Sequence, residues 1–253
     1  MFVYIGGNRE KPSIIYDYQP TRSGQSTEIL LKGFEGYLQT DAFAGYNIFN
    51  KNNKITSVGC WAHARRKFFD IVKITKQEGK AHEIIKKIKK LYKIEKYARI
   101  NKLSPEKRKT LRDKKSKPML DKIKKWLEKN YVKTAPKSML GKAMAYTLNN
   151  WQSLTKYLDN GILEIDNNLA ENAIRPFALG RKNWLFSNNE RGAKASAIIY
   201  SLIETCRKND IESYAYMKNI LIKLPYCKTT DDYEKLLPQN YNLQLQAKKD
   251  PPD

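Results

Sequence analysis

The chain has 253 residues with 41% hydrophobic and 11% aromatic side chains, which is the composition of a globular protein rather than of a disordered one. No apolar run reaches membrane-spanning length and no signal-peptide pattern follows Met1, so we expect a cytoplasmic protein without a membrane partner. The three cysteines, Cys60, Cys206 and Cys227, are scattered, which excludes a disulfide scaffold and a cysteine-based metal motif.

The net charge of +22 limits the possible partners most strongly, and it is unevenly distributed. Residues 71–142 contain 25 Lys and Arg against 7 Asp and Glu, a local net charge of +18. Such a field attracts polyanions, of which nucleic acid is the most common. The alternative is a set of solvated helix faces, since lysines outnumber arginines 37 to 11. We favour the nucleic-acid interpretation.

Strands alternate with helices in the first part of the chain. Two β-branched and aromatic runs, "MFVYIGG" and "SIIYDYQP", flank a turn and predict a hairpin. The helix expected next is "STEILLKGF", with Ser26 or Thr27 as its N-cap. The strand "YLQTD" then ends on Asp41, and the strand "ITSVGC" is followed by the helix "WAHARRKFFDIVKI".

From about residue 80 the pattern becomes entirely helical. The stretch "AHEIIKKIKKLYKIEKYARI" has a helical apolar period, Ser104-Pro105 starts another helix, and Pro118 and Pro136 punctuate two more. Glu171 lies on a short helix that Pro176 ends or kinks, and two further helices follow. We expect four parts: residues 1–78, a helical insertion over 79–160, residues 161–224 and a tail over 225–253.

This order of elements predicts an α/β fold. It resembles the ribonuclease-H arrangement with its first strand missing, interrupted by the lysine-rich helical insertion and completed by C-terminal helices. A topological likeness does not by itself assign a function.

Asp41 and Glu171 are the candidate catalytic residues. Hard cations such as Mg²⁺ prefer carboxylate oxygens, and carboxylates far apart in sequence can converge on ions that support phosphodiester displacement. The alternative is that Asp41 caps a turn and Glu171 pairs with Arg175. Spacing alone favours that alternative.

Four blocks change this balance: "GYLQTDAFAGYN", "GCWAHARRKFFD", "IDNNLAENAIRPFALGRKNWLFS" and "ASAIIYSLIETCRKNDIESYAYMKNIL". Together they resemble the transposase of the insertion sequence 66 family, over most of the chain. The resemblance implies a DDE recombinase with a ribonuclease-H-like core that needs Mg²⁺ or Mn²⁺. Asp41 would be its second metal-binding aspartate, and Glu171 the glutamate that completes the triad.

The same resemblance implies the partners: DNA at the element ends and target, further copies of the chain, and other proteins of the element. The residues expected to contact DNA are Arg65, Arg66, Lys67, Arg175, Arg181 and Lys182. The helical insertion is expected to hold flanking DNA.

The chain departs from the family at its N-terminus, where the strand carrying the first aspartate is missing. Asp17 lies on the wrong strand to replace it. We therefore expect an N-terminally truncated transposase, with a catalytically inactive remnant that binds DNA or intact transposase as the alternative. An unrelated RNA-binding protein is disfavoured because RNA-module signatures are absent.

Local patterns assign structural roles to several other residues. Asn167 and Asn168 are expected to cap the glutamate helix. Trp61 and Trp184 can stack on unpaired bases, but core packing is the expected role of both. Cys60 is expected to be a small apolar residue of the core.

Overall fold

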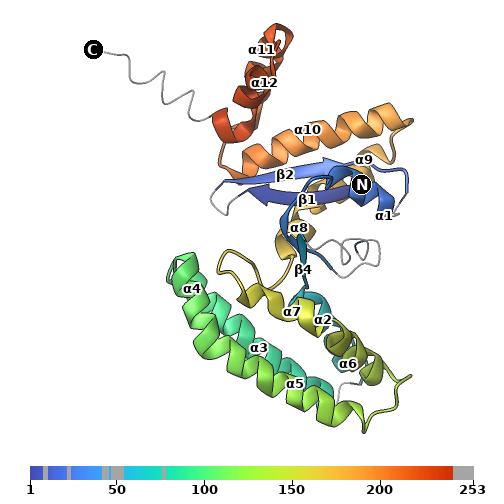
Figure 1. Cartoon of the computed structure of the whole chain (residues 1–253). Coiled ribbons are helices and arrows are strands. Elements are labelled where there is room, and N and C mark those ends of the chain that lie inside the picture. The colour runs from blue at the N-terminus through green and yellow to red at the C-terminus, as the bar shows by residue number, and fades with distance from the viewer. Residues whose placement is uncertain (8–10, 22–23, 42–45, 47–53, 76–77, 242–253) are drawn as a thin grey trace. The chain divides into compact units, whose positions relative to one another are not determined.

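A computed structural model describes the chain except for residues 8–10, 22–23, 42–45, 47–53, 76–77 and 242–253. The described residues are mostly helical, with two sheets of two strands each, which agrees with the predicted α/β composition (Figure 1). The chain divides into two compact units, one of residues 1–21 with 169–253 and one of residues 22–168. No helix of the described residues is long and apolar enough to cross a bilayer.

The first unit begins with the predicted hairpin. Strands β1 (Phe2–Gly7) and β2 (Pro12–Asp17) pair antiparallel in a register that places Phe2 opposite Asp17. Ile14 and Tyr16 point into a core that includes Ala173 and Ala197. The helices of this unit are α8 (Asn168–Ala173), which starts at its boundary, α9 (Arg175–Trp184), α10 (Glu190–Lys208), α11 (Ser213–Lys223) and α12 (Thr230–Leu236), with the short turn η4 (Leu224–Tyr226).

Helix α10 runs along the hairpin and bonds to the outer edge of β2 through side chains (Figure 1). The Ile14 N–H donates to Thr205 Oγ1 at 2.9 Å, and that hydroxyl donates back to the Ile14 carbonyl at 3.1 Å. The Tyr16 N–H donates to Ser201 Oγ at 2.8 Å, and Asn209 Nδ2 donates to the Pro12 carbonyl at 2.9 Å. Residues spaced by four lie on one helix face, so one face of α10 satisfies the backbone of β2.

Replacing Thr205 with valine is expected to destabilise this unit by about 1–3 kcal/mol, because the buried Ile14 N–H and carbonyl lose their partner. The change keeps the side-chain shape, so little packing is lost. Thr205→Ser, which keeps the hydroxyl, is the control. Equal midpoints of urea unfolding for the valine and serine variants would show that the hydroxyl does not satisfy this strand.

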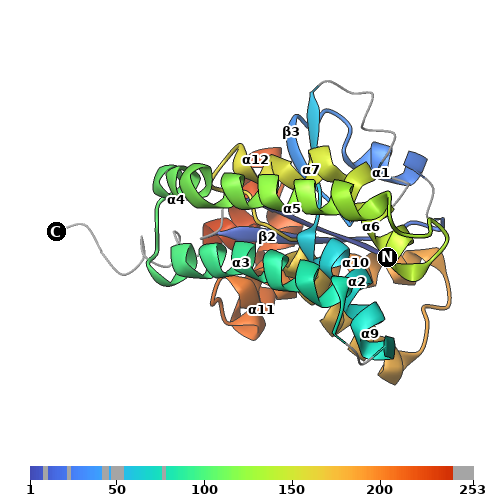
Figure 2. The ribbon, with the colours of Figure 1, turned by 90° about the horizontal axis from the view of Figure 1, so that it is seen from below.

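The second unit contains a parallel strand pair and a helical bundle. Strands β3 (Gly36–Gln39) and β4 (Ile55–Val58) pair with Gly36 beside Ile55. Figure 2 shows the two long helices of the bundle, α3 and α5, side by side. The helical elements are α1 (Gly24–Leu30), α2 (Trp61–Thr75), α3 (Lys80–Ile100), α4 (Pro105–Leu111), the π-helical segment η2 (Arg112–Ser116), α5 (Lys117–Tyr131), α6 (Met139–Asn149), α7 (Trp151–Thr155) and the turn η3 (Lys156–Leu158).

Apolar faces of α2, α3, α5 and α6 form the core of this unit. Trp61 is fully buried and donates from Nε1 to the Leu154 carbonyl at 2.8 Å, so its predicted core position is confirmed. The predicted apolar stripe of α3 is buried at Ile84, Ile88 and Leu91.

A buried ionic cluster lies at one end of this bundle. The Glu95 side chain, 2% exposed, accepts from Arg112 Nε at 2.8 Å and from Arg108 Nη2 at 2.6 Å. Arg108 Nη2 also donates to Glu164 Oε2 at 2.8 Å. Burial opposes ionisation of Glu95, but the hydrogen bond and charge of Arg112, with those of Arg108, lower its pKa overall. The cluster is therefore charged at neutral pH.

The same arginines hold the segment between the bundle and α8. Arg112 Nη1 donates to the carbonyls of Tyr157 and Asn160, at 2.5 and 2.9 Å, and its Nη2 donates to the Leu163 carbonyl at 2.7 Å. Arg112 starts the π-helical turn η2, a rare geometry that is frequently found at functional sites.

The structure contradicts two expectations from the sequence. The helix expected over residues 26–34 is α1, Gly24–Leu30, so Ser26 and Thr27 lie inside it and neither is its N-cap. Its supposed apolar stripe is open, since Ile29 is 73% exposed. Pro118 does not separate two helices, because α4, η2 and α5 follow one another without a break and Pro118 lies in the first turn of α5.

Candidate functional site

Asp41 follows the carboxyl end of β3, which ends at Gln39. Its side chain is exposed, and its backbone carbonyl accepts a hydrogen bond from Tyr146 Oη at 3.3 Å. Burial, and after it the negative charge of Asp41, raises the pKa of Tyr46. The carboxylate is therefore accessible at a strand end.

The segment that leads to Glu171 is anchored at the carboxyl ends of both strands of the second unit. Gln39, the last residue of β3, donates from Nε2 to the Glu164 carbonyl at 2.8 Å. Just beyond β4, the Trp61 N–H donates to the Ile165 carbonyl at 3.1 Å and Cys60 Sγ accepts the Asn167 N–H at 3.4 Å. Residues 164–167 therefore lie at the carboxyl ends of β3 and β4. Asp41 follows β3 at the same end.

Glu171 lies on α8 and is half-buried. Asp166 accepts the Asn168 N–H at 3.2 Å and the Asn168 side-chain amide at 2.9 Å. The Asp166 carboxylate thus accepts the hydrogen bonds at the start of α8, where Asn167 and Asn168 were predicted to cap the helix. The helix ends at Ala173, whose carbonyl accepts a hydrogen bond from Tyr16 Oη, and Arg175 and Pro176 open α9. The predicted break at Pro176 is confirmed.

The six basic residues predicted to contact DNA are all exposed and lie on two helices. Arg65, Arg66 and Lys67 are on α2; the Arg65 guanidinium lies 5.7 Å from the Phe69 ring centroid and Lys67 Nζ lies 4.4 Å from that of Tyr146. Arg175, Arg181 and Lys182 are on α9 in the other unit. Exposure permits contact with a polyanion for each of them.

Comparison with known proteins shows the family of the chain. Residues 1–195 match the family described as "Transposase IS66 family", and residues 201–239 match the "IS66 C-terminal element". The chain belongs to the IS66 transposase family. No solved structure matches it.

Three Sinorhizobium fredii proteins are similar to this IS66 family chain. They carry the names uncharacterized protein y4hP, y4jD and y4qI, and are 36%, 34% and 30% identical over 245, 239 and 242 residues. The alignments cover 91%, 91% and 93% of this chain but 44%, 46% and 44% of the relatives. The chain thus spans less than half the length of these relatives.

The two carboxylates expected to form the IS66 metal site belong to different units of the chain. Asp41 is in the unit of residues 22–168, and Glu171 is in the unit that combines residues 1–21 with 169–253. Asp41 is exposed just beyond β3, whereas Glu171 is half-buried within α8 and its Oε1 is buried. Their convergence on one ion stays a prediction.

Trp184 is the site residue of this IS66 chain that the sequence misassigned. It is 36% exposed rather than buried, and it lines a pocket together with Tyr18 and Phe186. The available signal was the basic pair directly ahead of two aromatic residues in "RKNWLF". Cys60, in contrast, is buried as predicted, and burial raises its pKa to about 11, so its thiol stays protonated at neutral pH.

Proposed function

We propose that this chain is the catalytic part of a DDE-type transposase that cuts and joins DNA with divalent metal ions bound by Asp41 and Glu171. Its core would be ribonuclease-H-like, built from β1 to β4 with α2 and the C-terminal helices. The observation that carries the proposal is the anchoring of residues 164–167 at the carboxyl ends of β3 and β4.

That anchoring limits where the glutamate helix can begin. Asp41 follows β3 by two residues, and the chain from Asn167 reaches Glu171 after four residues, all of them in α8. A helix rises about 1.5 Å per residue, so Glu171 cannot lie far from the anchored segment. Family membership and chain connectivity thus support the same pair.

The chemistry of the two side chains fits Mg²⁺ or Mn²⁺, which prefer carboxylate oxygens. When bound, such ions activate an attacking oxygen and stabilise the leaving oxygen of a phosphodiester. Asp41 and Glu171 would hold the ion. Arg175, Arg181 and Lys182, exposed on the following helix, would neutralise phosphates of the bound strand.

The test is nicking of supercoiled plasmid by the full chain, with Mg²⁺ or Mn²⁺ against EDTA. Nicking that requires the ion is the expected result. Binding of the plasmid without any nicking in either metal would instead identify an inactive remnant that binds DNA. Absence of both binding and nicking would contradict the proposal and that alternative together.

We also propose that the lysine-rich bundle binds DNA. Its unbalanced positive charge lies on the outside, because the buried Arg108 and Arg112 are neutralised by carboxylates. Lys122, Lys125 and Lys129 are exposed on α5. Converting them to glutamine is expected to flatten the slope of log K against log salt by about 0.9 for each lysine that contacts a phosphate. Anisotropy titrations of labelled duplex over a salt series measure this slope.

The matched control removes three exposed lysines elsewhere, Lys208, Lys218 and Lys228, and so changes the net charge equally. If both triple variants changed the slope alike, the bundle would have no special role in DNA binding.

A further inference from the structure

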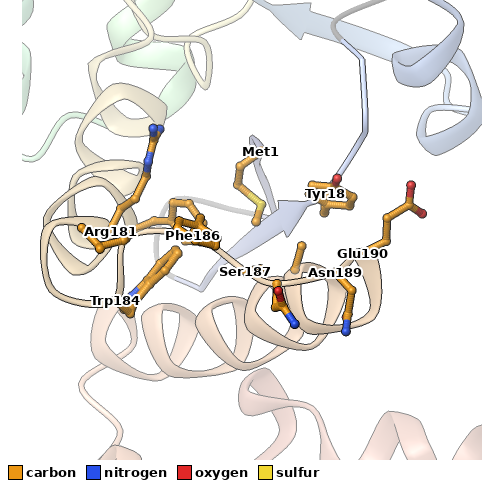
Figure 3. Close-up of a pocket in the computed structure, with 12 residues that line it drawn as sticks. Met1, Tyr18, Arg181, Trp184, Phe186, Ser187, Asn189 and Glu190 are labelled. Carbon is orange, nitrogen blue, oxygen red and sulfur yellow. The ribbon is translucent and has the colours of Figure 1, made fainter.

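A pocket of about 480 Å³ in the first unit has no role in the proposed metal site (Figure 3). Arg181 and Trp184 reach it from the end of α9, and Phe186 comes from the connection to α10. Tyr18 follows β2, and Glu190 starts α10. Its volume is within the range of about 300–1,000 Å³ typical of small-ligand sites.

Aromatic surface is unusually open at this pocket. Phe186 is 74% exposed, Leu185 is 64% exposed and Trp184 is 36% exposed, in three consecutive positions. Large apolar side chains that group together on a surface commonly mark a binding site, whereas scattered single ones do not. Flat aromatic rings beside an arginine provide what a nucleobase with its phosphate requires.

The backbone holds these rings in an uncommon conformation. Leu185 has φ 63° and ψ −70°, and the Phe186 N–H donates to the Trp184 carbonyl at 2.8 Å. This is a γ-turn of the rare type with positive φ, which is strained for a residue with a branched side chain. Such strain persists at sites where the surrounding structure fixes a functional geometry. Leu185 is the central residue of this turn, with Trp184 and Phe186 on either side of it.

Trp184 is held from behind by a stack of aromatic residues. Its ring meets Phe177 edge-on with centroids 5.2 Å apart, and Phe177 packs in the same way on Tyr200, also at 5.2 Å. Gly180 makes room for this stack, because a methyl group there would overlap Tyr200 Oη and lie 2.9 Å from Trp184 Nε1. The indole is therefore positioned before any ligand arrives, which reduces the entropic cost of binding.

The two sides of the pocket carry opposite charges. Figure 3 shows Arg181 and Glu190 on opposite sides, with the Trp184 and Phe186 rings nearer Arg181 and the Tyr18 ring nearer Glu190. A phosphate is attracted to the Arg181 side and repelled from the Glu190 side. Asn189 accepts the Gly192 N–H at 2.8 Å through its Oδ1, so its amide NH₂ can donate to a base edge.

We infer that this pocket binds one unpaired nucleotide of the DNA, with its base against Trp184 and Phe186 and its phosphate toward Arg181. The inference rests on the proposed function for the presence of DNA, but not on the metal site. Because every base has a π-face, the pocket should tolerate any sequence. It selects frayed or single-stranded DNA over a fully paired duplex, whose bases are inaccessible.

The experiment compares the affinity of the full chain for a labelled duplex with its affinity for the same duplex carrying a short single-stranded overhang. The wild-type chain is expected to prefer the overhang about tenfold, the effect of one stacked base. Trp184→Ala and Phe186→Ala are expected to remove the preference and leave duplex affinity unchanged. Tyr226→Ala, at an aromatic residue 79% exposed on η4, is the control and should keep it.

A second readout is 2-aminopurine in the overhang, whose fluorescence is quenched on stacking. Phe186→Ala keeps the inference testable if Trp184→Ala unfolds, since Phe186 is mostly outside the core. Equal affinity of the wild-type chain for both DNAs would overturn this inference alone. So would a change in oligomeric state on losing Phe186, which would make the surface a contact between copies. No binding to either DNA would overturn the proposed function as well.

Discussion

Replacing Glu171 with glutamine is expected to reduce metal-dependent nicking at least about a hundredfold, since even indirect partners of a metal ligand cost about 10–100-fold when removed. Glutamine keeps the size and hydrogen-bonding capacity of the half-buried side chain but removes the negative charge that a hard cation needs. DNA affinity measured in EDTA should not change. Initial nicking rates over a Mn²⁺ titration separate weaker ion binding from a slower reaction.

Asp41→Asn should give the same loss, and the double variant should add little to either single change, because residues that act on one ion are not additive. Glu234→Gln, at an exposed carboxylate of α12, is the matched control and should nick like the wild-type chain. Persistent nicking by either ligand variant would remove that residue from the proposed metal site. Mn²⁺ binding followed by electron paramagnetic resonance gives a readout independent of cleavage.

Replacing Glu95 with glutamine is expected to lower the free energy of unfolding of the helical unit by about 3–5 kcal/mol, the cost of breaking a buried ion pair from one side. Arg112 is fully buried and Arg108 is 4% exposed, so both would keep a charge that the remaining carboxylate, Glu164, cannot balance. Urea unfolding followed by circular dichroism at neutral pH measures the loss. Glu128→Gln removes an exposed carboxylate 4.0 Å from Lys124 and should change stability by less than about 1 kcal/mol.

The pH dependence follows from the direction of the Glu95 shift. Its pKa is lowered in the folded state from an ordinary value of 4.5, so its stabilising contribution is complete above that value. The contribution is lost as pH falls through the folded-state pKa. The stability difference between the wild-type chain and Glu95→Gln should therefore shrink in acid below pH 4.5. A difference that stayed constant into strong acid would contradict the ionised state of Glu95.

Local patterns predicted the elements better than the faces that they bury. The β-branched and aromatic runs of the hairpin identified β1 and β2, and the apolar period of α3 identified that helix. In α2 the residues Ala62, Arg66 and Phe69 form one row with helical spacing, but the buried row is Trp61, Ala64, Phe68 and Ile71. Both rows have helical spacing, so periodicity identifies a helix but does not decide which of two adjacent rows meets the core.

Long-range partners explain what could not be predicted. Glu95 is buried because Arg108 and Arg112 come from a later helix, and no local pattern announces such a partner. Trp184 is supported by Phe177 on its own helix and, through it, by Tyr200 from α10, which is a tertiary arrangement. The candidate metal site has the same character, since spacing between Asp41 and Glu171 carried no signal and the family resemblance alone paired them.

The hydroxyl groups of α10 also affect how copies of the chain can associate. An uncovered strand offers unpaired amides and carbonyls to any passing strand, which is a common origin of aggregation. Along β2 these backbone groups are already hydrogen-bonded by the side chains of Ser201, Thr205 and Asn209, which take the place of a neighbouring strand. Extension of this hairpin into a larger sheet, by another copy or by another segment, can therefore proceed only from the β1 side.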